Sequence, residues 1–165
     1  MLSPTLEKAI NEQINKEFYS AYLYLSMAAH FDALNLPGFA KWMKVQAGEE
    51  QGHGMRLYGH VYDRGGKVTL EAIVRPPVDF ARPLAVFEQV LEHEKQVTAS
   101  IKALYGLAAK EGDDAAAIFL QWFVNEQVEE EKNATDIIQQ LKMSGDQSFG
   151  LLFMDTHVLG KRGKD

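Results

Sequence analysis

Apolar residues recur at steps of three and four along four long stretches of the chain. This spacing places one apolar side chain per turn on the same face of an α-helix, so it predicts four amphipathic helices. Pro-Gly, Gly-Gly and Gly-Asp pairs mark the ends of these stretches. The predicted helices cover about 5–33, 38–64, 83–111 and 114–143, and a short amphipathic helix follows at about 147–159.

The apolar stripe of each long helix defines its expected buried face. In the first helix the stripe consists of Leu6, Ile10, Ile14, Ala21, Leu25 and Ala28. In the second helix it consists of Phe39, Met43, Leu57 and Val61. The third and fourth helices carry Leu84, Phe87, Leu91, Thr98, Ile101, Tyr105 and Ala108, and Phe119, Phe123, Ala134, Ile137 and Leu141. Four such stripes must bury one another, which predicts an all-α four-helix bundle in one domain covering 1–165.

The lengths of the connections predict how the helices are arranged. The connections at 34–37 and 112–113 are short, so the helices that they join are expected to form antiparallel pairs. The connection at 66–82 is longer and includes a strand-like run at 67–70. It reaches at most about 56 Å when extended, whereas a helix of about 27 residues is roughly 40 Å long. This connection can therefore cross the whole bundle, which makes the second and third helices parallel.

Polar side chains interrupt every stripe. The interrupting residues are Glu17 in the first helix, Gln46, Glu50 and His53 in the second, Glu94 in the third, and Gln127 and Glu130 in the fourth. A single glutamate on an apolar stripe is usually a boundary residue whose carboxylate reaches water. Here, however, the depths of these residues in the bundle agree within about 5 Å, at a rise of 1.5 Å per residue. Four carboxylates and one imidazole are therefore expected to meet in one layer of the core.

A metal centre would explain this layer. Four carboxylates in a partly desolvated core repel one another, and two divalent cations would cancel that repulsion. Oxygen-rich ligands with one imidazole favour iron or manganese, while zinc and copper could occupy the same sites. The second helix has a Glu-x-x-His motif and the fourth has Gln-x-x-Glu instead, so the two ion positions should be unequal. One is expected to use Glu17, Glu50 and His53, and the other Glu94, Glu130 and the shared Glu50, with Gln127 as a weak or indirect partner.

The composition limits other classes of function. The chain of 165 residues is 46% hydrophobic and contains no cysteine, which excludes disulfides, iron–sulfur clusters and thiol nucleophiles within it. A formal net charge of −6 disfavours nonspecific binding to nucleic acid or to an anionic membrane. No apolar run reaches the roughly 18 residues of a membrane span, and the first residues are expected to lead into a helix and not to form a signal peptide. A cytoplasmic location is therefore predicted.

Six short segments carry a more specific signal: NEQINKE at 11–17, AYLYLSM at 21–27, EEQGH at 49–53, EHE at 92–94, FLQWF at 119–123 and EQVEEE at 126–131. With them, essentially the whole chain resembles the ferritins of the non-haem bacterial and archaeal type. The resemblance implies a ferroxidase centre that binds two iron ions at Glu17, Glu50, His53, Glu94, Gln127 and Glu130. It also implies a third iron site built from Glu49, Glu126 and Glu129 with Glu130. The implied reaction is oxidation of Fe(II) by dioxygen or hydrogen peroxide, with storage as mineral in a hollow homo-oligomeric shell of 24 chains.

Other positions refine this resemblance. Tyr24 lies two turns beyond Glu17 on the same face, so it is predicted to be a core phenol that hydrogen-bonds a ligand carboxylate and gives an electron to oxygen intermediates. Bacterioferritins ligate haem through a methionine at the position of Gln51, so no haem is expected. The remaining histidines have no converging partners in the pattern and are predicted to be surface or packing residues: His30, His60, His93 and His157.

Three other classes of protein compete with this interpretation. A di-iron peroxidase or oxygenase of the rubrerythrin or monooxygenase kind usually has a second Glu-x-x-His motif, and a rubrerythrin also has a cysteine-ligated iron; the chain has neither. A DNA-protecting miniferritin typically builds its site between subunits, lacks a fifth helix and has a longer basic tail than residues 161–164. Buried carboxylates oppose a purely structural bundle. The size of the assembly separates these classes, because a ferritin shell approaches half a megadalton.

Overall fold

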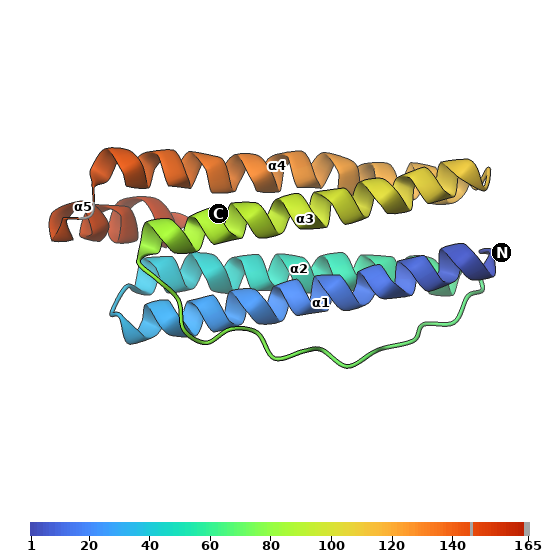
Figure 1. Cartoon of the computed structure of the whole chain (residues 1–165), viewed down its shortest axis with the longest axis horizontal. Helices are drawn as coiled ribbons and strands as arrows, with labels where there is room; N and C mark the ends of the chain where they lie inside the picture. The colour runs from blue at the N-terminus through green and yellow to red at the C-terminus, as the bar shows by residue number, and fades with distance from the viewer. Residues whose placement is uncertain (146, 164–165) are drawn as a thin grey trace.

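Four long helices lie side by side along one axis (Figure 1). The structure is a computed structural model that describes residues 1–145 and 147–163. The helices α1 to α4 span Pro4–Ala33, Pro37–Asp63, Pro83–Lys110 and Asp114–Ser144, with ends no more than one residue from the predicted ones. The predicted fold class, an all-α four-helix bundle with one long crossover, is confirmed.

Prolines and side-chain caps set the beginnings of the helices. α1, α2 and α3 each begin at a proline, which fits the first turn because an N–H there has no helical acceptor. Ser3 caps α1, since its Oγ accepts a hydrogen bond from the Leu6 N–H at 3.0 Å. Asp113 caps α4 in the same way, accepting from the Ala116 N–H at 3.0 Å. Gly112, with a φ of 68°, provides the sharp turn between α3 and α4.

The segment 66–82 crosses the bundle from one end to the other, so α2 and α3 run parallel (Figure 1). Asn11 of α1 holds its first part: the side-chain amide donates to the Lys67 carbonyl at 2.9 Å and accepts from the Thr69 N–H at 2.8 Å. The strand-like run at 67–70 is not a strand, because its backbone groups bond to a helix side chain instead of a neighbouring strand.

Two clusters of buried apolar side chains fill opposite halves of the bundle. One cluster includes Leu6, Ile10, Leu57, Ile101 and Leu120. The other includes Met27, Phe31, Phe39, Met43 and Phe87. A layer of buried polar residues lies between them, at mid-length of the four helices.

Seven positions of the predicted stripes lie off the buried face: Leu25, and the half-buried Ala21, Leu84, Leu91, Thr98, Tyr105 and Phe119. Leu25 is 48% exposed, and its neighbour Tyr24 is buried instead. In α3, Leu91 and Thr98 are half-buried, while the residues one position earlier, Val90 and Val97, are fully buried. The reason is that 3.6 residues per turn do not match a fixed step of three and four, so the buried row drifts by one residue along a long helix.

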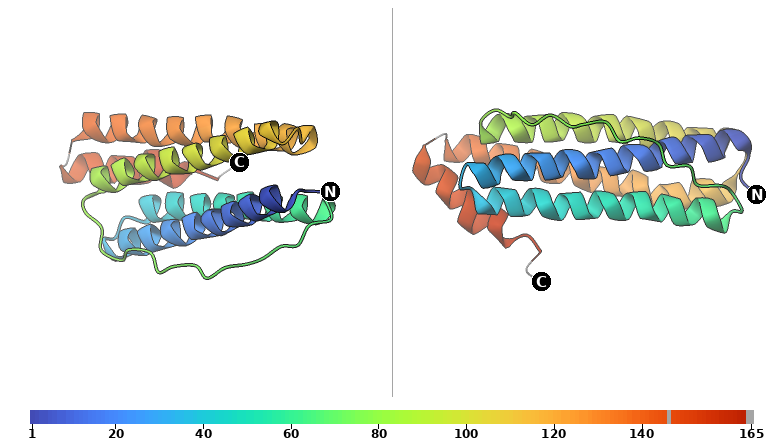
Figure 2. Two further views of the ribbon diagram at one scale, coloured as in Figure 1. Left: turned by 45° about the vertical axis from the view of Figure 1, so that its right-hand side comes forward. Right: turned by 90° about the horizontal axis from the view of Figure 1, so that it is seen from below.

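The predicted fifth helix is less regular than expected. α5 spans Ser148–Phe153, a π-helical turn follows at Met154–Val158, and a 3₁₀ turn at Leu159–Lys161 completes the segment. This segment turns back beside the beginning of α2 (Figure 2). The Asp155 carboxylate there accepts from the Phe39 N–H at 2.9 Å and satisfies the first turn of α2. No helix in the described part of the chain is long and apolar enough to cross a membrane.

Candidate metal centre

The polar layer between the two apolar clusters brings together residues from all four long helices. Each of them is at most 6% exposed. The layer consists of Gln13 and Glu17 from α1, Gln46, Glu50 and His53 from α2, Glu94 from α3, and Gln127 and Glu130 from α4. The structure therefore places in one layer all six residues predicted for the paired site.

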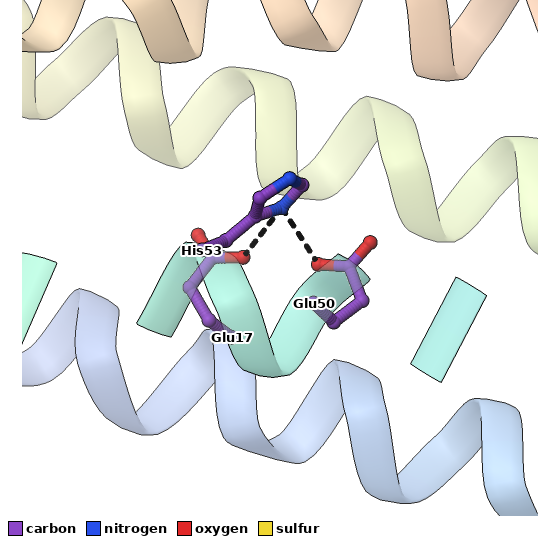
Figure 3. Close-up of side chains that lie close together, drawn as sticks. All are labelled: Glu17, Glu50 and His53. Atoms are coloured by element: carbon purple, nitrogen blue, oxygen red, sulfur yellow. Dashed lines mark ion pairs between the residues drawn. The ribbon is translucent and has the colours of Figure 1, made fainter. Parts of the chain in front are cut away.

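His53 lies between two carboxylates (Figure 3). Its Nδ1 is 3.3 Å from Glu50 Oε2 and 3.9 Å from Glu17 Oε2. One ligand atom from each of the three residues lies within 4.8 Å of the others. Atoms bound to one ion at about 2.1 Å can be at most about 4.2 Å apart, so only small side-chain movements are needed for all three to bind one cation. Glu17, Glu50 and His53 form the first half of the centre.

One oxygen of Glu17 has no partner among residues 1–145 and 147–163. Its Oε1 accepts a hydrogen bond from Gln13 Nε2 at 2.6 Å. Its Oε2 is buried and has no hydrogen-bond partner among the described residues. Leaving a buried carboxylate oxygen unsatisfied is costly, on the order of 1–3 kcal/mol or more. A cation beside His53 Nδ1 would satisfy this oxygen.

The carboxylates of Glu94 and Glu130 form the second half of the centre, and protein donors already hold them. The Tyr24 hydroxyl donates to Glu94 Oε1, and Gln127 Nε2 donates to Glu94 Oε2 at 3.1 Å. Gln46 Nε2 donates both to Glu130 Oε2 at 2.9 Å and to Glu50 Oε1 at 3.0 Å. A cation in this half would therefore compete with, or add to, hydrogen bonds that are already made.

Burial and mutual repulsion raise the pKa values of three glutamates in this layer. Burial raises the pKa of Glu17 well above its usual range, and the nearby Glu50 carboxylate raises it further. Burial also raises the pKa of Glu50, with additional repulsion from Glu94 and Glu130. The pKa of Glu130 rises to about 7, first through burial and then through the Glu94 charge. Without a cation, these carboxylates thus hold protons under conditions in which exposed glutamates have lost them.

The donor set fits divalent iron. The layer contains four carboxylates and one imidazole in a desolvated core, which is the hard, oxygen-rich set that iron and manganese prefer. Two divalent cations would balance four ionised carboxylates. They would also pair the free Glu17 oxygen and lower the raised pKa values by adding opposite charge.

The residues predicted for a third iron site are not all brought together. Glu126 lies beside the centre, with Oε1 at 3.9 Å from His53 Nε2, and it forms a second potential ligand group with His53 and Glu130. Glu49 is instead paired with Arg162 near the C-terminus, and Glu129 is exposed. The third site therefore remains a prediction, with Glu126 and Glu130 as its best-placed members.

Some functional contacts were missed from the sequence. Gln13 was not singled out, although it precedes Glu17 by four residues and therefore shares its helix face. His93 was expected to have no converging partner, but its Nε2 lies 2.8 Å from Ser20 Oγ, and its ring packs against Tyr24. The Ser20 contact joins α1 to α3, and no local spacing in the sequence indicates such a pair.

The fold and this layer together define a class of protein. A four-helix bundle with inward-facing carboxylates on every helix and a Glu-x-x-His motif is the arrangement of the di-iron carboxylate proteins. The comparison with known proteins agrees with this class. A family model described as a ferritin-like domain matches residues 7–144. The chain therefore belongs to the ferritin family, whose members store iron.

Relatives and solved structures are similar along nearly the whole chain. A bacterial non-heme ferritin of Bacteroides fragilis is 44% identical, covering 98% of this chain and 100% of that protein. One from Staphylococcus aureus is 38% identical, covering 100% and 99%. The open-pore ferritin of the hyperthermophilic archaeon Archaeoglobus fulgidus is 48% identical with a TM-score of 0.96, covering 98% of this chain and 99% of that one.

Proposed function

We propose that this chain oxidises Fe(II) to Fe(III) at a two-ion centre within each subunit and stores the product as mineral inside a hollow shell of 24 chains. The observation that carries the proposal is the unpaired, buried Glu17 oxygen beside His53 and Glu50. Membership of the ferritin family supports the choice of iron as the substrate. Cytoplasmic location remains a prediction.

Each half of the centre has its own part in the proposed reaction. Glu17, Glu50 and His53 bind one Fe(II), and Glu94 and Glu130 bind the second with Gln127 at their side. Each ion gives up one electron, so the pair can reduce dioxygen by two electrons to the level of hydrogen peroxide. Hydrogen peroxide itself is an alternative oxidant, since it also accepts two electrons. The carboxylate ligands favour Fe(III) over Fe(II) because they carry negative charge.

The protein's own groups supply positioning and protons. Because the pKa values of Glu50 and Glu130 are raised, these carboxyl groups hold protons in the metal-free protein and release them when a metal ion binds. Burial, followed by the Glu94 charge, raises the pKa of Tyr24 well above its usual range, so its hydroxyl stays protonated and keeps donating to Glu94. Tyr24 thereby orients a ligand, and we also assign it the role of electron donor to oxygen intermediates. Glu49, Glu126 and Glu129 are proposed to receive a third ion next to Glu130.

Stopped-flow oxidation at two Fe(II) per subunit tests the proposal. We expect rapid oxygen-dependent oxidation in the parent protein and none in the double variant Glu50→Ala plus His53→Ala, because the first half of the centre is then lost. Glu12→Ala, which removes an exposed carboxylate of α1, is the control and should react like the parent. Equal rates in the parent and the double variant would refute the assignment. A particle near 440 kDa, from 24 chains of 18.5 kDa, is expected by light scattering.

A further inference from the structure

Arg162, near the end of the chain, lies against α2. Its Cζ is 4.2 Å from the centroid of the Trp42 ring, and Nη1 donates to the Trp42 carbonyl at 3.5 Å. Its Nη2 donates to Gln46 Oε1 at 2.7 Å and pairs with the Glu49 carboxylate. These three partners lie four and three residues apart, on one face of α2. The segment that carries Arg162 turns back beside this part of α2 (Figure 2).

Gln46 connects Arg162 to the metal centre. It is completely buried, and its amide nitrogen donates to Glu50 Oε1 and Glu130 Oε2 while its oxygen accepts from Arg162. A guanidinium contains only donors, and the carboxylates of Glu50 and Glu130 contain only acceptors once a bound cation has displaced their protons. Turning the amide round would therefore place donor against donor on one side and acceptor against acceptor on the other. Arg162 thus allows one orientation of Gln46, the one that links Glu50 to Glu130.

We propose that Arg162 is a positioning residue of the iron centre, which acts through Gln46 to fix the spacing of Glu50 and Glu130. The proposal rests on the iron-oxidising function proposed above. It makes the segment after α5 part of the centre, although Arg162 itself binds no iron. The Trp42 ring and the Glu49 carboxylate hold the guanidinium in place, and its side chain is only 19% exposed.

Lys41 provides a matched control. Its Nζ donates to the Gly160 carbonyl at 3.1 Å, so it anchors the same C-terminal segment to α2 without contacting Gln46. If Arg162 only fastened the segment, then Lys41→Ala and loss of Arg162 should have similar effects. If Arg162 acts through Gln46, then only loss of Arg162 should alter the metal centre.

The test compares Arg162→Met, Gln46→Met and the double variant, with Lys41→Ala and the parent protein. Methionine keeps an unbranched stem against Trp42 but removes every donor of Arg162, which preserves most of the packing. Two quantities are measured on assembled particles: the initial rate of oxidation at two Fe(II) per subunit, and the affinity and visible spectrum of Co(II) as a redox-stable probe. Loss of a partner that orients a metal ligand typically costs about 10–100-fold in affinity or activity.

We expect Arg162→Met and Gln46→Met each to lower the rate and the Co(II) affinity at least about tenfold and to change the Co(II) spectrum in the same way. In the Gln46→Met background, Arg162→Met should lower the rate and the affinity by less than about a further twofold, because the connection is already broken.

Three results would overturn the inference while leaving the proposed function standing: full additivity of the two substitutions, an Arg162→Met variant that behaves like the parent, or the same loss in Lys41→Ala. A parent protein without rapid oxidation would instead refute the function. If Arg162→Met does not assemble, a Gln46→Met variant with parent-like Co(II) binding likewise overturns the inference.

Discussion

The two halves of the metal centre differ in how far the protein has already satisfied them. In the first half, Glu17 Oε2 has no hydrogen-bond partner among the described residues and lies 3.9 Å from His53 Nδ1. In the second half, both oxygens of Glu94 accept hydrogen bonds, one from Tyr24 and one from Gln127. The first half thus leaves an oxygen that a cation would complete, whereas protein donors already occupy both oxygens of Glu94 in the second half.

This difference predicts an order of binding. A cation entering the first half gains an imidazole and a free carboxylate oxygen and displaces few contacts. A cation entering the second half must share Glu94 and Glu130 with their protein donors. We therefore expect the first ion to bind among Glu17, Glu50 and His53, and the second to bind more weakly.

The largest expected effect comes from removing His53. His53→Ala deletes the imidazole of the first half and should lower the affinity for the first Co(II) by more than about 100-fold, which exceeds the cost of losing an orienting partner. Glu94→Ala should leave that first binding step intact and weaken the second. Calorimetric titration of the metal-free protein measures both steps. If the two variants lost the same step, the halves would not be distinct.

A smaller effect concerns the proton held by Glu130. Because burial and the Glu94 charge raise its pKa from 4.5 to about 7, the folded metal-free protein keeps a proton that the unfolded chain has released. The stabilisation that this proton gives to the folded state is therefore fully present below about pH 4.5 and is lost as the pH rises to about 7. The glutamine of Glu130→Gln does not titrate, so this variant does not lose stability as the pH rises. Its free energy of unfolding relative to that of the parent should therefore increase by about 2–3 kcal/mol between pH 4.5 and pH 8.

Denaturant unfolding of chelator-treated protein across this pH range measures the difference. Glu92→Gln, an exposed carboxylate of α3, is the control and should follow the parent at every pH. A Glu130→Gln variant whose stability relative to the parent does not change with pH would show that the second half is solvated and not buried.

The smallest effect compares the two glycines that flank His53. A Cβ at Gly52 would meet nothing within 4 Å, so Gly52→Ala should stabilise the subunit by about 0.8–1 kcal/mol through helix propensity. A Cβ at Gly54 would lie 2.9 Å from the Phe18 ring, so Gly54→Ala should instead cost on the order of 1–3 kcal/mol. Thermal unfolding of the two variants measures the contrast. Equal gains would show that α1 and α2 can separate beside the first half.

The features of the fold and the metal centre that depend on the helical period could be predicted from the sequence. Counting helical turns gave the ends of α1 to α4 to within one residue. It also predicted that four carboxylates meet in the core, those of Glu17, Glu50, Glu94 and Glu130. Counting turns also misplaced Leu25, because a fixed step does not follow the drift of a long helix.

Contacts between distant segments could not be predicted in this way. Asp155 caps α2 from the C-terminal segment, and Arg162 reaches Gln46 from the same segment. These pairs depend on how α5 turns back along α2, which no local pattern specifies. The ion pair between Glu49 and Arg162 is a further contact of this kind, at a residue that the resemblance assigns to a third iron site.

Anomalous diffraction at the iron edge, from crystals soaked in Fe(II) without oxygen, tests the central claim most directly. We expect one strong iron peak bound by Glu17, Glu50 and His53 Nδ1, and a weaker one bound by Glu94 and Glu130. Iron found only on exposed carboxylates, with no peak in the polar layer, would contradict it.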